Sequence, residues 1–478
     1  MTRQQRLRDA FNGTAGGAAD IIYSRLVHSL PWIQPFFSKG WGDLNVVDFN
    51  EDARAFQHWP PPHFDQLKIH WERKEAGKSK RSGHGFELLE GTFRTPCTGR
   101  IYDALPEESR TARVQLLLPA KSGAAHACVL HLAATGDQSF RGRIQLGAPL
   151  LSQGIATMVL ESPFYGRRAP VLQQGSRLER VSDLLVLGRS TIEESLCLLH
   201  WAQAQGFARL GMSGFSMGGV HACMVASLYP FPIACTPLLA PRSAGAAYCK
   251  GALSVATGWR SLTSPLDERG KDVGDTVWRA AQHNLITSAS LRVLQKPHIF
   301  RTLQQNSRDF SHAFTDSNSQ PQHSPFGNIP PSAVPASDTS NCGTNDTERE
   351  MSRKARGQTQ WGFNSGAVQR WLGGIWSSNR QTMPAHDTEL ARQRLEQVLE
   401  TFTDITRFPV PQCPQAAVLV GAYEDQYVPS SSILELAEHW QGCELRWVHG
   451  GHVSAFVMQH PMFRRAILDS IARLPGTE

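Results

Sequence analysis

The 478-residue sequence has no apolar stretch that approaches the ~18–20 residues of a membrane-spanning helix. It also has no Cys-x-x-Cys pair, no His/Cys cluster with zinc spacing and no glycine-rich phosphate loop of nucleotide type. The net charge of +6 is diffuse, and no basic groove with interleaved aromatics accompanies it. We therefore expect no metal, no organic cofactor and no nucleic-acid partner.

The nine cysteines do not suggest a disulfide framework, because they are odd in number, scattered and often placed in apolar segments. Reduced, buried thiols are typical of intracellular proteins, so an intracellular location is expected. Hydrophobic residues make up 41% of the chain, which is ample for one large α/β domain with additions. The cysteines are Cys97, Cys128, Cys197, Cys223, Cys235, Cys249, Cys342, Cys413 and Cys443.

The N-terminal region lacks the continuous apolar core of a signal peptide but carries both arginines and aromatics. This combination is compatible with a mitochondrial presequence, with an anchor at a membrane surface, or with a helical arm packed on the domain. Arginines and interfacial aromatics together predict work at a membrane surface without crossing it. The arginines are Arg3, Arg6, Arg8 and Arg25, and the aromatics are Trp32, Phe36, Phe37 and Trp41.

The most informative segment is Gly214-Phe215-Ser216-Met217-Gly218, which follows a short apolar run and precedes small and apolar residues. Strand, sharp turn and helix form the context in which Gly-x-Ser-x-Gly carries a nucleophilic serine. The turn is strained, so the residues two before and two after the serine need almost no side chain. Such a turn also points the N–H of Met217 toward a developing oxyanion.

An acid and a histidine follow in the order that a serine hydrolase of this kind requires. Residues 416–420 read as a buried strand that leads to Glu424 and Asp425, and residues 445–448 read as the next strand, followed by His449 and His452. Asp425 is preferred over Glu424 for its spacing to a Val-Pro turn. His452 is preferred over His449 because two glycines precede it, whereas strand alternation predicts a packing role for His449.

A second oxyanion donor is expected in the loop after the strand at residues 128–132. The loop is small, and a donor from Ala133 to Thr135, centred on Ala134, is predicted. Arg141 and Arg143 follow, and either cap the site, contact an anionic substrate or lie in a solvated first helical turn, the last being favoured.

These motifs resemble the α/β-hydrolase superfamily and, more closely, the α/β-hydrolase domain-containing protein 18 family. The resemblance covers residues 80–270 and 405–475 and implies the serine-hydrolase fold and the triad Ser216, Asp425 and His452. It does not settle the substrate, because this fold also hosts non-hydrolytic members. The residues that carry it include His131-Leu132-Ala133, Leu160-Glu161, Pro163-Phe164-Tyr165-Gly166, Val181-Ser182-Asp183-Leu184, Leu210-Gly211-Met212, Gly442-Cys443-Glu444-Leu445-Arg446 and Gly450-Gly451-His452.

The predicted fold class is α/β: an α/β-hydrolase fold with a mostly parallel sheet, helices on both faces, a helical cap and a disordered insertion. Residues 1–80 are predicted to form an irregular, tryptophan-rich arm with amphipathic character. Residues 81–302 form the first part of the core, with the cap at about 243–300. Residues 303–360 are rich in Ser, Asn, Gln, Pro and Thr, which predicts disorder, and residues 361–478 complete the core.

Further elements are expected at defined positions. Strands are predicted at residues 86–95, 114–118, 128–132, 155–160 and 233–239, and helices at 141–153, 182–205 and 456–474. Trp259, Leu262, Val273, Trp278 and Leu285 in the cap either line the pocket or belong to the core.

The predicted chemistry is hydrolysis of an acyl ester, with lipid esters favoured by the cap and the basic surface. Ser216 attacks the carbonyl, His452 moves the proton, Asp425 orients His452, and water hydrolyses the acyl-enzyme. A thioesterase or amidase would use the same residues. The alternative of a different class is a hydrolase fold kept as a non-catalytic binding or scaffold protein.

Overall fold

The computed structural model describes residues 16–18, 20–24, 33–47, 67–78, 85–120, 125–280 and 384–476. All of these except Pro384 belong to one compact unit. Residues 303–360, for which disorder is predicted, and Leu285 lie outside the described residues.

The described part of the chain contains one mixed sheet in the order β1-β2-β3-β5-β4-β6-β7-β8-β9. The strands from β1 to β3 pair antiparallel, β3 also pairs antiparallel with β5, and all pairs from β5 onward are parallel. The bounds are β1 His70–Lys78, β2 Gly85–Arg94, β3 Thr111–Pro119, β4 Ala127–Leu132, β5 Ile155–Leu160, β6 Arg209–Phe215, β7 Ala234–Leu238, β8 Val418–Ala422 and β9 Glu444–Val448.

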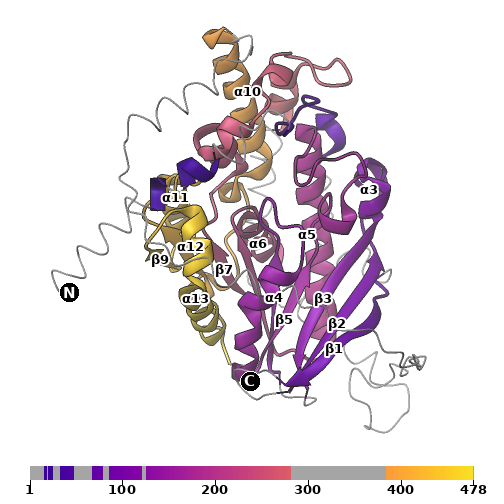
Figure 1. The fold of residues 1–478 in the computed structure, drawn as a ribbon, viewed down its shortest axis with the longest axis vertical. Helices are drawn as coiled ribbons and strands as arrows, with labels where there is room; N and C mark the ends of the chain where they lie inside the picture. Colours follow the sequence, from indigo (N-terminus) through magenta and orange to yellow (C-terminus); the bar gives the residue numbers. More distant parts are fainter. Residues whose placement is uncertain are drawn as a thin grey trace, which may run out of the picture. The chain divides into compact units, whose positions relative to one another are not determined.

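Strand position follows from side-chain chemistry. Every residue of β4, β5 and β7 is buried, as expected for parallel strands covered on both faces. The edge strand β1 instead carries His, Glu, Arg and Lys, which discourage pairing with another chain. Figure 1 shows β1, β2 and β3 at one edge of the sheet and β9 at the other.

Helices cover both faces of this sheet. On one face α4 and α13 enclose a core of β4, β5, β7 and β8 side chains, and on the other α5 and α6 pack against each other. The helices are α3 Gly99–Ala104, α4 Arg141–Gly147, α5 Val181–Ala204, α6 Met217–Leu228, α10 Ala385–Thr403, α11 Ser430–His439, α12 His452–Met458 and α13 His460–Ala472.

Short helical turns complete the described chain. One is a π-helix, Ala246–Lys250 (η6), and the rest are 3-10 turns. They are η1 Leu44–Val46, η3 Glu107–Arg110, η4 Ala148–Gln153, η5 Gly166–Arg168, η7 Ala252–Ala256, η8 Trp259–Leu262, η9 Ile405–Arg407 and η10 Pro414–Ala416. The described part of the cap, residues 243–280, therefore begins with short turns rather than long helices.

Most of the expected elements are present, with three corrections. The helix expected at 141–153 changes to a 3-10 turn at Ala148, and the helix expected at 456–474 is two helices, α12 and α13. The irregular arm predicted for residues 1–80 is wrong at 70–78, because these residues form β1. The alternation of polar and apolar residues is weak in this segment, so the strand depends on tertiary contacts, chiefly its pairing with β2.

Three of the four aromatics expected at a membrane surface are buried in the protein instead, so a membrane contact of these three side chains is wrong. Phe36, Phe37 and Trp41 are at most 2% exposed, and both phenylalanine rings lie against Tyr248, at centroid distances of 5.3 and 5.1 Å. The backbone N–H of Phe36 donates to Ala256 O at 2.8 Å, so this segment packs as part of the domain. Trp32 and the four arginines lie outside the described residues.

Two further observations concern the described residues only. None of their helices combines the length and apolar character needed to cross a bilayer. Their eight cysteines are free thiols, and seven of the eight are buried.

Candidate active site

Ser216 occupies a strained turn between β6 and α6. Its backbone dihedrals are φ 54° and ψ −118°, a region that residues with a Cβ rarely adopt. A Cβ on Gly214 would overlap the carbonyl group of Gly218, and a Cβ on Gly218 would overlap the carbonyl oxygens of Leu132 and Ala133. The steric reason for both motif glycines, expected from the sequence, is therefore present in the structure.

Backbone hydrogen bonds hold this turn on both sides. The N–H of Ser216 donates to Leu238 O at 2.8 Å, and the N–H groups of Gly219 and Val220 donate to Ser216 O at 2.9 and 3.1 Å. Met217 is the first residue of α6, where a helix leaves N–H groups without an intrahelical partner. The turn thus presents the Ser216 hydroxyl and the first N–H groups of α6 together.

Asp425 and His452 form a buried pair. Asp425 Oδ2 lies 2.7 Å from His452 Nδ1, and the two side chains are only 4% and 8% exposed. The other carboxylate oxygen of Asp425 accepts the N–H groups of Tyr427 and Val428, both at 2.8 Å. With one oxygen held by the backbone, the other is fixed toward the imidazole.

The neighbouring candidates have different contacts. Glu424 Oε2 accepts the N–H of Gly450 at 2.7 Å and so contacts the histidine loop rather than the imidazole. His449 is exposed beside the ring of Tyr423, at a centroid distance of 5.3 Å, so the packing role in the sheet expected for it is wrong. Of the two possible acids and two possible histidines, the structure brings Asp425 and His452 together.

The imidazole of His452 lies next to the serine turn. Its ring is 4.9 Å from that of Phe215, the residue before Ser216, and is stacked on Tyr427 at 5.0 Å. Aromatic rings on two sides restrict the orientation of the imidazole. Nε2, the nitrogen not directed at Asp425, is the one available for work on a hydroxyl.

The loop after β4 lies against the serine turn, since a Cβ added to Gly218 would overlap the carbonyl oxygen of Ala133 in this loop. It closes on itself through Asp137 N–H, which donates to Ala134 O at 3.1 Å, and Thr135 lines the same pocket as Ser216 and Met217. Burial raises the pKa of Tyr165, against the lowering effect of the Thr135 side chain, so its phenol is neutral beside this loop.

Arg143 anchors the loop after β4, and the prediction that it lies in a solvated helical turn is wrong. It is 7% exposed, its Nε lies 2.7 Å from Asp137 Oδ2, and its guanidinium also donates to the carbonyls of His131 and Ser139. Arg141 is exposed, as expected. Arg143 therefore neither caps the pocket nor meets a substrate: it anchors the loop.

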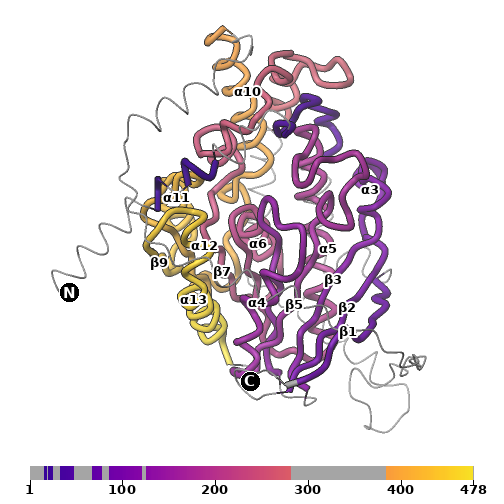
Figure 2. Tube along the Cα trace, viewed as in Figure 1, coloured from indigo at the N-terminus to yellow at the C-terminus, as the bar shows by residue number. Residues whose placement is uncertain are grey.

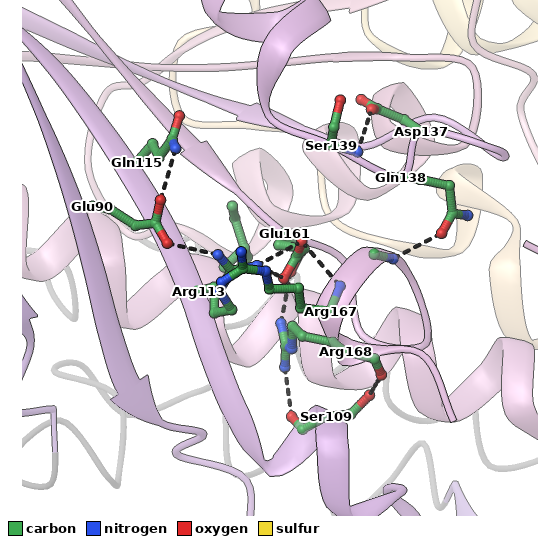
Figure 3. A network of polar contacts seen from close by, with 12 residues as sticks. Glu90, Ser109, Arg113, Gln115, Asp137, Gln138, Ser139, Glu161, Arg167 and Arg168 are labelled. Carbon is green, nitrogen blue, oxygen red and sulfur yellow. Dashed lines mark hydrogen bonds and ion pairs between the residues drawn. The ribbon is translucent and has the colours of Figure 1, made fainter. Parts of the chain in front are cut away.

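A polar network joins this loop to the turn that follows β5 (Figure 3). Gly166 N–H donates to Gln138 Oε1 at 2.8 Å, and Arg113 donates twice to Glu161, at 3.1 and 2.9 Å. Arg168 is fully buried and pairs with Glu194 at 2.6 Å. The predicted oxyanion loop is thereby tied to the turn after β5, which Arg113 in turn ties to β3.

A pocket of about 1000 Å³, including open space at its mouth, begins at Ser216. Its walls come from one face of α5, at Leu184, Gly188 and Ile192, and one face of α6, at Val220, Met224 and Leu228. Residues of α10 and η9 also line the pocket. These walls could not be predicted from the sequence, because apolar residues at helical spacing indicate a core as readily as a pocket.

The cap residues expected as pocket walls pack elsewhere. Leu262 and Val273 are buried in the core, Trp259 packs against it, and Trp278 is 62% exposed. Their core interpretation is correct for three of the four described residues. Tyr248, Leu253 and Ala247 line the pocket in their place.

Among the described residues, no group of three or more His, Cys, Asp and Glu side chains is arranged to hold a metal ion.

Comparison with known proteins gives one family match and several distant structural ones. A model of the family described as alpha/beta hydrolase domain containing 18 matches residues 34–473. Solved structures with a similar fold include an acetyl xylan esterase from Paenibacillus sp. R4, with 12% identity, TM-score 0.39, and coverage of 91% of this chain and 96% of that one. The rice cell wall degrading esterase LipA from Xanthomonas oryzae has 14% identity and TM-score 0.40, covering 86% of this chain and all of its own (100%).

Proposed function

Since the chain belongs to the alpha/beta hydrolase domain containing 18 family, with the fold that this membership implies, we propose that it is a serine hydrolase that cleaves an acyl ester. The observation that carries the proposal is the buried Asp425–His452 pair at 2.7 Å, beside a serine held at a strained φ of 54°. Strain at a polar residue in a pocket is a functional indication, because a structural serine would relax to an ordinary backbone conformation.

The proposed reaction proceeds through an acyl-enzyme. His452 Nε2 takes the proton of Ser216 as Oγ attacks the ester carbonyl, and Asp425 holds the imidazole and stabilises its cation. The N–H of Met217 and the predicted donor at Ala134 bind the oxyanion. His452 then gives the proton to the leaving alcohol, and water, activated by the same imidazole, releases the acid and restores Ser216.

The dimensions of the pocket favour a long acyl chain. Its residues on α6 run from Met217 to Leu228, the full 12 residues of the helix, which corresponds to roughly 18 Å. One leaflet of a bilayer has a hydrocarbon thickness of about 15 Å, half of the ~30 Å core. The length of this lining supports the proposal that a lipid acyl chain extends from Ser216 along α6.

The polar groups in this pocket carry little net charge. Burial lowers the pKa of His221 to about 4, so the imidazole is neutral at neutral pH. The guanidinium of Arg189 forms an ion pair with Glu193 at 2.6 Å. The negative charges of Asp404 and Glu400 stabilise the cation of Arg407. Apolar walls with internally compensated charges suit a hydrocarbon chain better than a sugar or a free anion.

A fluorophosphonate probe, which reacts with activated serines, tests the catalytic proposal. Wild-type protein should be labelled and Ser216→Ala should not be. Ser152→Ala removes an exposed hydroxyl that donates only to Pro149 O and should label like the wild type. Absence of labelling in folded wild-type protein would indicate instead a non-catalytic binding or scaffold protein.

A chain-length series of p-nitrophenyl esters tests the lipid part of the proposal. Each buried methylene contributes about 0.8 kcal/mol, so kcat/KM should rise from butyrate to dodecanoate. Matched thioesters and amides of the preferred acid separate the three acyl chemistries. A maximum at acetate would support the hydrolase proposal and contradict the proposal of a lipid substrate.

A further inference from the structure

A carboxylate from the N-terminal segment (residues 16–18 and 20–24) contacts both loops of the acid–histidine pair. Asp20 is fully buried, and its Oδ2 accepts the N–H of His452 at 2.6 Å and that of Gln426 at 3.2 Å. Its Oδ1 accepts the N–H of Val453 at 2.9 Å. In Figures 1 and 2 this segment, in indigo, lies beside the yellow helix α12.

We propose that Asp20 is a positioning residue for the reaction: it joins the acid loop to the histidine loop at the spacing where Asp425 meets His452. The inference rests on the proposed function. Asp20 touches the backbone of His452 itself and of Gln426, the residue after Asp425. A shift of Asp20 would therefore move the imidazole and the acid relative to each other.

A carboxylate suits this position better than any other side chain. Three N–H groups converge on it, and an ionised carboxyl has two oxygens that only accept. An amide would direct an N–H group at one of these donors and leave it without an acceptor in a buried place. The pKa of Asp20 is raised, because burial and the nearby charge of Asp425 outweigh the lowering effect of the three backbone hydrogen bonds. These three bonds are the contacts that stabilise the charged form.

Glycines on both sides permit the close approach. A Cβ on Gly16 would lie 2.6 Å from Gly451 N and 2.8 Å from the Cα of Gly450. A Cβ on Gly451 would lie 2.5 Å from Asp20 Oδ2. The Gly450-Gly451 pair before His452 thus does more than loosen the loop: it makes room for the N-terminal segment.

The segment has a second anchor that contacts neither Asp425 nor His452, although its hydroxyl also interacts with Tyr427, and this provides a control for the docking of the segment. Ser24 Oγ donates to Ala252 O at 2.9 Å, on the cap side of the molecule. Ser24→Ala weakens the docking of the same segment and leaves the three N–H contacts of Asp20 in place.

The test is steady-state hydrolysis of p-nitrophenyl butyrate by the full chain, with thermal melts of every variant. Asp20→Asn should lower kcat by roughly 10- to 100-fold, the cost of a misplacement of about 1 Å, and change KM little. Ser24→Ala should keep the kcat of the wild type. A merely structural Asp20 would instead lower the melting temperature and leave kcat of the folded protein unchanged.

Gly16→Ala is the second variant, because it displaces the segment sterically while Asp20 remains, and its kcat should fall as well. It decides the matter if Asp20→Asn does not fold. Folded Asp20→Asn with wild-type kcat, an equal loss in Ser24→Ala, or failure of both Asp20→Asn and Gly16→Ala to fold would each overturn the inference. Wild-type protein with no more activity than Ser216→Ala would instead overturn the proposed function. Failure of the proposed function is thereby distinguished from failure of the Asp20 inference.

Discussion

The two halves of the candidate site differ in how far along the chain their contacts reach. The serine half is local: Gly214, Ser216 and Gly218 form one turn between consecutive elements. The histidine half joins Asp425 to His452 across 27 positions and Asp20 to His452 across 432. The serine half is held by steric fit and backbone hydrogen bonds, and the histidine half by hydrogen bonds to carboxylates.

This difference predicts different failures. A substitution in the serine half meets backbone atoms that cannot move, so it should change stability and activity together. A substitution in the histidine half removes a polar contact, so it should change activity more than stability. The following variants examine that distinction, in order of decreasing effect on turnover.

Asp425→Asn should have the largest effect. By analogy with serine-protease triads, loss of the orienting carboxylate should lower kcat by about 10⁴-fold, while the fold persists because the new side chain has nearly the same shape. Glu424→Gln is the control: its amide oxygen can still accept the N–H of Gly450, so kcat should change by less than about threefold. The reverse order of effects would assign the acid role to Glu424.

Gly218→Ala should break the serine half. Its Cβ overlaps the carbonyl oxygens of Leu132 and Ala133, so the serine turn and the loop after β4 must separate. We expect a loss of about 1–3 kcal/mol in the free energy of unfolding and about 10²-fold in kcat. Gly142→Ala in α4, where the added Cβ meets nothing within 4 Å, is the control. A stable, active Gly218→Ala protein would contradict the steric account.

Gly188→Leu should alter selectivity rather than catalysis. Gly188 and His221 both line the pocket, and a Cβ on Gly188 would lie only 3.2 Å from His221 Nε2, so a larger side chain takes space from the acyl chain. The ratio of kcat/KM for dodecanoate over butyrate should fall about tenfold, the equivalent of two lost buried methylenes. An unchanged ratio would place the acyl chain elsewhere.

A substitution of His221 should have the smallest effect on turnover of these variants, and its main effect should be on stability at acidic pH. Its pKa is lowered from 6.5 to about 4 by burial, so between these values the unfolded chain binds more protons than the folded one. Stability that is complete above pH 6.5 should therefore decline as the pH falls toward 4, by a few kcal/mol in the limit. His221→Phe should flatten this decline in urea titrations at pH 7 and pH 4.5. An unchanged slope would show that other groups dominate.

The contrast between local and distant contacts also explains which features could be predicted from the sequence. The turn at Ser216 follows from a pentapeptide, because its steric requirement lies within five residues. The strands β4, β5 and β7 follow from continuous apolar runs. The order of Asp425 and His452 was accessible because each follows a recognisable strand.

Other features have no local signal. Trp41 and Phe36 read equally well as membrane-facing or core residues, and only the packing against Tyr248 and the cap decides. Arg143 reads as a solvated helix start until the carbonyls of His131 and Ser139 surround it. The edge strand β1 has a charged sequence that becomes a strand only beside β2.

By itself the sequence determined the fold class, the strained serine turn and the candidates for acid and base, because each depends on residue type and short spacing. The tertiary structure alone decided which helix faces form the pocket and that Asp20 lies against the histidine loop, and it brought together the acid and the histidine that spacing favoured. These features depend on contacts between segments that are from 27 to 432 positions apart, where a carboxylate, a glycine or a leucine has no preferred partner until the chain has folded.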